Sequence, residues 1–145
     1  MGTGLLLPDV DDADTAPFWA AARDRRLVAQ KCGACGTLRL PAHPFCGACR
    51  AEAVEWVALS GRGRLWSFIV HHGPTLPAFA PHVPFPVIVA ELAEDPRLPL
   101  VGNILAAPDA SIDSLEPASL RIGMPLAVTF REVAPGVTLP MWLPA

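Results

Sequence analysis

Short apolar runs rich in Val, Ile, Leu and Phe recur through the second half of the chain. Clusters of Gly, Pro and Asp separate them, which is the pattern of short strands joined by turns. Several runs are apolar on both faces of the expected strand, as when a small sheet closes on itself. The chain is therefore expected to be mainly β, with strands at Val54–Leu59, Arg64–Val70, Phe85–Leu92, Leu100–Leu105, Pro125–Val133 and Val137–Leu143.

About six short strands of this kind suit an OB-type β-barrel. A Gly-Arg-Gly turn signal at 61–63 predicts that Val54–Leu59 and Arg64–Val70 pair as a tight hairpin. The connection at Asp113–Ile122 is expected to be a short helix or turn, because a proline lies near its start and a glycine follows it.

One helix is expected ahead of the strands. Thr15 is suited to cap it, Pro17 suits its first turn, and the segment from Phe18 to Ala29 is rich in Ala, Arg and Leu. Residues 1–14 have no such pattern and are expected to form a loose N-terminal arm.

A Pro-rich segment, Gly73–Pro84, lies between two predicted strands and cannot itself be a central strand. Its apolar residues Leu76, Phe79 and Val83 alternate with prolines, so the loop is stiff and loses little entropy if it docks on a partner. The alternative is that the loop packs back on its own barrel.

The four cysteines form two CxxC pairs separated by ten residues. Two residues between thiolates let one tight turn aim both sulfurs at a single ion, and two such turns complete a tetrahedral shell. A shell filled by four protein ligands has no open position for water or substrate, so the metal is expected to be structural zinc. The ligands are Cys32, Cys35, Cys46 and Cys49.

Disulfides, a redox CxxC and an iron–sulfur centre are the competing interpretations. Disulfides need an oxidising compartment, and the acidic N-terminus with its short apolar stretch is unlike a secretory signal. A cytoplasmic location is therefore expected. The spacing by itself does not separate zinc from iron.

The formal net charge is −3, but basic residues are concentrated in one segment. Residues 20–65 hold eight Lys and Arg against three acids, a balance of 8 − 3 = +5. Such a segment suits phosphate groups, of nucleic acid or of a nucleotide-bearing small molecule, or it is simply a solvated face. With 145 residues, the expected organisation is an arm at 1–14, a helix and zinc ribbon at 15–55 and a barrel at 56–145.

Unaided catalysis is not expected. The cysteines are assigned to metal, and no serine lies in a nucleophile-elbow sequence. His71 and His72 follow a predicted strand and are candidates to contact a substrate, although adjacent strand residues point to opposite faces.

Several motifs together resemble the DUF35 family over about residues 15–143. They are a helix with Phe18-Trp19, the Lys31-to-Gly36 knuckle, Leu40-Pro41 before Phe45-Cys46, Gly61-x-Gly63 before Trp66-Ser67-Phe68, and the run Arg121-Ile122-Gly123-Met124-Pro125. The resemblance implies a rubredoxin-like zinc ribbon followed by an OB-fold domain. It also implies a noncatalytic accessory subunit of a thiolase-like enzyme that acts on acyl-CoA by condensation, retro-aldol cleavage or acyl transfer.

On this interpretation a CoA-like ligand binds at the interface with the partner. Arg62, Arg64, His71 and His72 are the candidate contacts with the ligand, and Phe18, Trp19, Leu76 and Phe79 are the candidate contacts with the partner. A free-standing CoA or acyl-carrier binder is a further possibility. The runner-up is a nucleic-acid-binding zinc-ribbon and OB-fold protein, which the acidic pI of about 5.7 and the single Lys disfavour.

Overall fold

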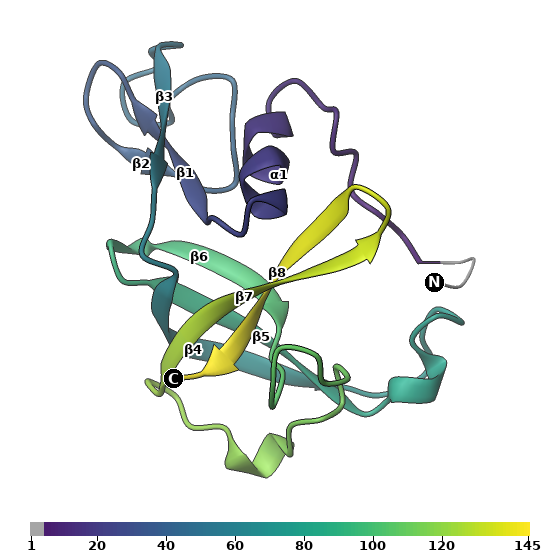
Figure 1. Cartoon of the computed structure of the whole chain (residues 1–145). Helices are drawn as coiled ribbons and strands as arrows, with labels where there is room; N and C mark the ends of the chain where they lie inside the picture. Colours follow the sequence, from purple (N-terminus) through teal and green to yellow (C-terminus); the bar gives the residue numbers. More distant parts are fainter. Residues whose placement is uncertain (1–4) are drawn as a thin grey trace.

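The structure is a computed structural model that describes residues 5–145. A helix and a small three-stranded sheet lie beside a five-stranded sheet, which confirms the mainly β prediction (Figure 1). The elements in chain order are α1 (Ala16–Arg23), β1 (Val28–Cys32), β2 (Leu38–Arg39), β3 (Val54–Ala58), β4 (Arg62–His71), the 3-10 turn η1 (Ala80–His82), β5 (Phe85–Leu92), β6 (Asp95–Asn103), the 3-10 turn η2 (Pro117–Ser119), β7 (Pro125–Ala134) and β8 (Val137–Pro144).

Helix α1 starts where the sequence predicts but ends six residues earlier than Ala29. Its end is a Schellman motif, in which the Arg26 amide donates to the Ala21 carbonyl and the Arg25 amide donates to the Ala22 carbonyl, both at 2.9 Å. Arg25 takes the left-handed conformation (φ 58°) that glycine usually supplies at this position. The expected helix was therefore too long, because no glycine marks the stop.

The first sheet has the order β2-β1-β3 and is antiparallel throughout. Gln30 on β1 lies opposite Arg39 on β2 and Trp56 on β3, so these three side chains share one face. Gln30 and Arg39 are buried, and the Arg39 Nε donates to the Gln30 Oε1 at 3.0 Å.

The second sheet has the order β6-β5-β4-β7-β8. A parallel bridge between Ile104 and Trp142 brings its two edge strands together, so the sheet curls into a partly closed barrel. This architecture confirms the OB-type prediction. Strand β6 begins at Asp95, five residues before the predicted start at Leu100. The prolines between these residues argued against a strand, but β6 tolerates prolines because it is an edge strand.

The predicted hairpin between Val54–Leu59 and Arg64–Val70 is wrong. β3 pairs with β1 in the first sheet, whereas β4 pairs with β5 and β7. Gly63 is needed for close approach and not for a turn, because any side chain there would clash with the backbone carbonyl of Glu91 on β5. The expected boundary between residues 55 and 56 lies within β3 and stays a prediction.

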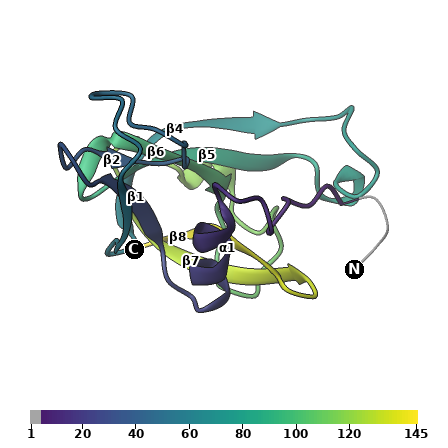
Figure 2. The ribbon, with the colours of Figure 1, turned by 90° about the horizontal axis from the view of Figure 1, so that it is seen from above.

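One apolar core joins the helix, the first sheet and the barrel, with Phe18, Leu27, Leu65, Ile88 and Trp142 among its buried members. Seen from above, α1 lies against β7 and β8 (Figure 2). The helix therefore covers one side of the barrel instead of standing apart with the ribbon.

A smaller cluster lies beneath the β7–β8 hairpin and is formed by Leu105, Val133, Val137 and Met141. Leu5 and Val10 pack against it, so the described part of the expected loose arm is held on the barrel. Residues 1–4 of that arm lie outside the described residues. Among the residues that the structure describes, no helix is long and apolar enough to cross a bilayer.

Candidate functional site

The four cysteines converge at the end of the first sheet. Their sulfur atoms all lie within 4.8 Å of one another, with Cys32 to Cys49 at 3.5 Å and Cys35 to Cys46 at 3.7 Å. A tetrahedral ion with Zn–S bonds of about 2.3 Å places its sulfurs about 3.8 Å apart. The spacing of the thiols therefore suits a four-thiolate zinc site.

The two halves of the site repeat one backbone pattern. The Gly36 amide donates to the Cys32 carbonyl at 3.0 Å, and the Arg50 amide donates to the Cys46 carbonyl at 2.8 Å. Both Gly36 (φ 76°) and Arg50 (φ 65°) are left-handed, which closes each knuckle. The left-handed conformation costs Arg50 free energy, and zinc binding would offset that cost.

Backbone amides in each knuckle also point at the sulfurs. Hydrogen bonds from the amides of Cys49 and Ala48 lower the pKa of the Cys46 thiol to about 6, and those of Cys35 and Ala34 lower the pKa of Cys32. The backbone thus favours the thiolate form at Cys32 and Cys46, whereas the neighbouring sulfurs raise the pKa of Cys49 to about 11. This is a structural zinc site of the rubredoxin type, which confirms the prediction from the cysteine spacing.

The predicted CoA contacts do not gather in one place. Arg62 and Arg64 line a depression of about 400 Å³ on the barrel, and the Arg64 Nη2 pairs with the Glu91 Oε2 at 3.1 Å. His71 lies seven residues after Arg64 on β4, a distance of about 23 Å along an extended strand. Its ring packs on Phe85, with ring centres 5.2 Å apart. His72 is exposed after the strand end. Their roles in ligand binding stay predictions.

The predicted docking residues differ in what they offer a partner. Phe18 is only 9% exposed and lies in the core, so its side chain has little free surface. Trp19 is half-buried against the same core, and Leu76 is 44% exposed. Phe79 is half-buried beside Phe85, with ring centres 6.0 Å apart, so part of the Pro-rich loop does pack back on the barrel.

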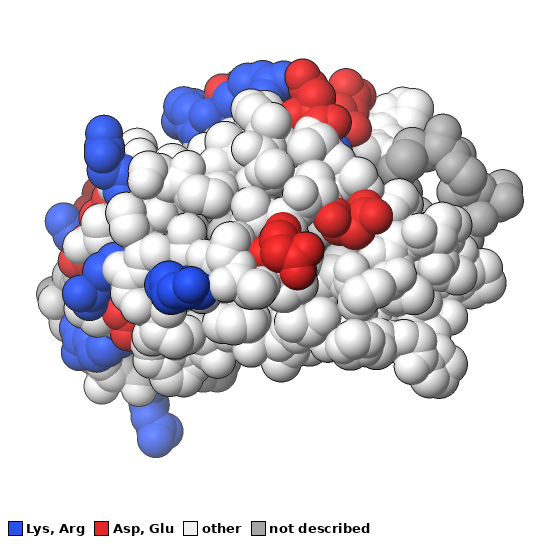
Figure 3. Space-filling view, turned by 90° about the horizontal axis from the view of Figure 1, so that it is seen from below, with Lys and Arg blue, Asp and Glu red and all other residues white. Residues whose placement is uncertain are grey.

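The basic segment predicted around the ribbon is only partly a surface feature. Arg39 is buried, and the Arg25 Nη1 donates to the Phe130 carbonyl at 3.0 Å, which ties α1 to β7. In the face seen from below, Lys and Arg side chains gather toward one end and along one edge, and most of the remaining surface is uncharged (Figure 3). The charge distribution does not form a continuous basic track on this face.

Sequence reasoning missed a cleft of about 610 Å³, which shares no lining residue with the zinc site. The N-terminal arm, the loop around η1, the loop at 106–112 and the β7–β8 hairpin form its walls. In both ribbon views the arm and η1 lie at the same end of the molecule (Figures 1 and 2). The residues that line the cleft come from several separate segments of the chain, which share no sequence motif. Only one of these segments, the Pro-rich loop Gly73–Pro84, was singled out from the sequence.

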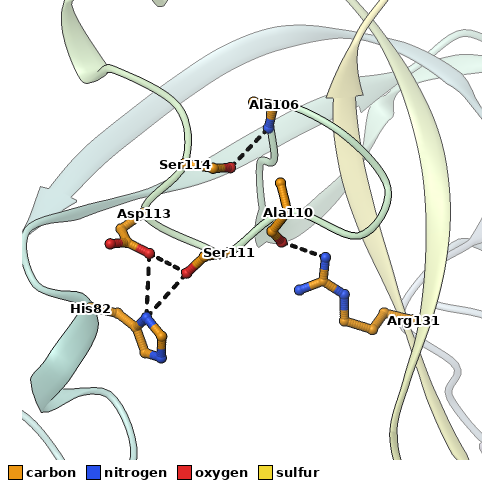
Figure 4. Close-up of polar contacts among 7 residues, drawn as sticks. All are labelled: His82, Ala106, Ala110, Ser111, Asp113, Ser114 and Arg131. Atoms are coloured by element: carbon orange, nitrogen blue, oxygen red, sulfur yellow. Dashed lines mark hydrogen bonds and ion pairs between the residues drawn. The ribbon is translucent and has the colours of Figure 1, made fainter.

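Three polar side chains meet at this cleft (Figure 4). The His82 Nδ1 lies 3.1 Å from the Ser111 Oγ and 3.3 Å from the Asp113 Oδ1, and the Ser111 hydroxyl donates to the same carboxylate. The Ser111 hydrogen bond, with a smaller contribution from His82, lowers the pKa of Asp113. The Arg131 Nη2 donates to the carbonyls of Pro108 and Ala110.

This group is not a catalytic triad. In a triad the nucleophile and the carboxylate contact different nitrogens of the imidazole, so that the ring can relay a proton between them. Here Ser111 and Asp113 both contact Nδ1, and the Asp113 carboxylate also accepts a hydrogen bond directly from the Ser111 hydroxyl. The group therefore orders the loop and orients the His82 ring.

Two protein-family models match the chain. The ChsH2 rubredoxin-like zinc ribbon domain matches residues 19–55, and the ChsH2 C-terminal OB-fold domain matches residues 56–131. A solved structure described as the Ltp2-ChsH2(DUF35) aldolase has a chain with 36% sequence identity and a TM-score of 0.79, covering 94% of this chain and 98% of that chain.

Curated relatives agree with this assignment. A probable enoyl-CoA hydratase alpha subunit from Thermomonospora curvata is 39% identical over 91% of this chain, and a 3-oxo-4,17-pregnadiene-20-carboxyl-CoA hydratase alpha subunit from Mycobacterium tuberculosis is 34% identical over 90%. The chain spans only 38% of the length of each. A DUF35 domain-containing scaffold protein from Methanocaldococcus jannaschii is 28% identical, over 79% of this chain and 75% of that protein. The chain therefore belongs to the DUF35 family, in the ChsH2 form that joins a rubredoxin-like zinc ribbon to an OB-fold domain.

Proposed function

We propose that the chain is a noncatalytic accessory subunit of a thiolase-fold enzyme complex that acts on acyl-CoA or related acyl substrates. The observation that carries this proposal is the match, over almost the whole of both chains, to the chain described as the Ltp2-ChsH2(DUF35) aldolase. The hydratase alpha subunits support the acyl-CoA part, because both names refer to CoA thioesters. The reaction would be condensation, retro-aldol cleavage or acyl transfer.

The chemistry of the described residues supports a noncatalytic role. All four thiols serve one metal site with no open coordination position. The one Ser, His and Asp cluster found at a cavity has the wrong connectivity for nucleophilic catalysis. The reacting groups would consequently come from the partner.

An exposed apolar face supports assembly with a protein. Ile69 on β4 lies opposite Val87 on β5, and two residues away Val89 lies opposite Val101 on β6, so these side chains share one outer face. Ile69 and Val101 are each 61% exposed, and Trp66, three residues before Ile69 on β4, is 58% exposed. Exposed apolar groups in one patch are typical of a surface that a partner covers. We assign this outer face of β4, β5 and β6 to the thiolase-fold subunit.

Arg62 and Arg64 would contact CoA phosphates in a groove completed by the partner. The Arg64 guanidinium already pairs with Glu91, so in the free chain only the Arg62 guanidinium at this depression is left to bind a phosphate. Weak CoA binding by the free chain and stronger binding by the complex would follow. This separates the proposal from a free-standing CoA or acyl-carrier binder.

The test is titration of the purified chain with CoA and with single-stranded DNA at rising salt. The proposal expects weak binding of both to the free chain and a gain in CoA affinity of at least tenfold in the complex. DNA binding that weakens steeply with salt would overturn it in favour of the nucleic-acid alternative. We also infer a cytoplasmic location, since four reduced thiolates suit a reducing compartment.

A further inference from the structure

We propose that the cleft between η1, the 106–112 loop and the β7–β8 hairpin binds a neutral, largely hydrocarbon small molecule that carries a hydroxyl group. The proposal stands apart from the accessory-subunit function, because the cleft shares no residue with the Arg62 and Arg64 depression or with the zinc site. Its volume of about 610 Å³ lies within the range of small-molecule sites, roughly 300–1,000 Å³.

The wall of the cleft is mainly apolar. Its apolar residues include Leu5, Phe79, Ile112, Val133, Leu139 and Met141. Val133 and Met141 are buried members of the smaller core cluster, and Leu5, Ile112 and Leu139 pack against that cluster. The floor is thus a continuation of a packed core, which holds its shape without a ligand and favours hydrocarbon.

The charges around the cleft disfavour an anion. Asp109 and Glu132 line it and are exposed, whereas Arg131 is the one cation among the lining residues apart from His82. The Arg131 Nη2 is already held by two backbone carbonyls of the 106–112 loop. A carboxylate or phosphate would therefore meet two acids and a partly engaged guanidinium, and a neutral molecule is preferred.

His82 supplies the polar contact. Its Nδ1 lies 3.3 Å from the Asp113 carboxylate, and because a carboxylate accepts hydrogen bonds, we assign the ring hydrogen to Nδ1. The other ring nitrogen, Nε2, then carries a lone pair and lies on the side of the ring away from Asp113 (Figure 4). A lone pair accepts a hydrogen bond, so the ligand needs a donor, and a hydroxyl is the neutral donor that an otherwise hydrocarbon molecule carries most simply.

The experiment uses the ¹⁵N-labelled full chain, with three probes of one length at neutral pH: 1-decanol, its methyl ether and decanoate. We expect 1-decanol to shift amides around the cleft, such as those of Ala110, Ile112 and Met141, in a saturable way. The ether, which lacks the donor, and decanoate, which carries the charge, should each bind at least fivefold more weakly. Equal affinity for the three probes, or no saturable shift at the cleft, would overturn the proposal.

Two variants localise the effect. Ala78→Trp places a large side chain in the cleft wall and should lower the decanol affinity at least tenfold, while Ala80→Trp, exposed in the same loop and outside the lining, should leave it unchanged. His82→Phe should bind the alcohol and the ether equally. Shifts in the cleft that appear only with a protein partner would identify a docking groove and contradict the proposal.

Discussion

The Leu105 amide donates a hydrogen bond to the Trp142 carbonyl at 2.9 Å, and this bond joins the two edges of the five-stranded sheet. Trp142 is fully buried, and its indole ring packs on Gly102 of β6 so closely that a Cβ there would lie 3.2 Å from it. At this partial closure of the barrel, one large side chain is set against one residue that has none. The walls of the cleft and the exposed face of β4, β5 and β6 are positioned by this closure.

Gly63→Ala should destabilise the fold by about 1–3 kcal/mol, because the added methyl group would push against the Glu91 carbonyl and separate β4 from β5. Gly47→Ala is the matched control, since nothing lies within 4 Å of a Cβ at Gly47. Urea unfolding of both variants measures the difference. Equal stability of the two would contradict the close approach of β4 and β5.

Cys32→Ser should release zinc and unfold the knuckles, since a three-thiolate shell with a hydroxyl binds zinc far more weakly. The variant should also melt at a lower temperature, because Val28 and Ala29, on the same strand β1 as Cys32, belong to the shared core. Zinc per chain and the thermal melting curve are the measurements. Ala34→Ser, exposed in the same knuckle, should keep its metal, and full zinc content in Cys32→Ser would exclude this cysteine as a ligand.

Asp113 should contribute to the pH dependence of stability. Its pKa is lowered in the folded chain, first by the Ser111 hydrogen bond, so its contribution is fully present above the ordinary pKa of about 3.9 and is lost as pH falls through the lower folded value. Melting curves of the native chain and Asp113→Asn should therefore differ most near pH 6 and converge near pH 2. A difference that grows toward low pH would have the wrong sign.

Ile69→Asp should weaken assembly with the partner at least tenfold and change the stability of the free chain little, because the side chain is 61% exposed. Ile122→Asp is the matched control, because Ile122 is 64% exposed and lies between η2 and β7, outside the strands of the proposed face. Sedimentation of the reconstituted complex gives the affinity, and melting of the free chain gives the stability. Loss of stability without loss of affinity would place Ile69 in an intramolecular role.

The sequence predicted the parts of the fold whose signals are local. Cysteine spacing located the zinc site, and apolar runs located most strands, because the spacing of a knuckle and the alternation of a strand are set within a few residues. The end of α1 was missed because Arg25 takes a conformation typical of glycine. The partner of β3 was missed because Gly63 fits both a turn and a close strand contact, and only the tertiary structure separates the two.

The cleft could not be predicted for a different reason. His82, Ser111 and Arg131 lie in three separate segments, and no spacing rule relates them. Likewise, the burial of Arg39 has no local signal, since its cross-strand partner Gln30 is identified only by the register of β1 and β2. Sites assembled from distant connections need the fold before they can be seen.

The most direct test of the accessory-subunit proposal is affinity capture of the tagged chain from a lysate of its native cell at moderate salt, with mass spectrometry of the retained proteins. The proposal predicts a thiolase-fold protein in stoichiometric amount, whose turnover of an acyl-CoA substrate depends on the chain. Nucleic acid or ribosomal proteins lost steeply as salt rises, with no thiolase-fold protein, would contradict it.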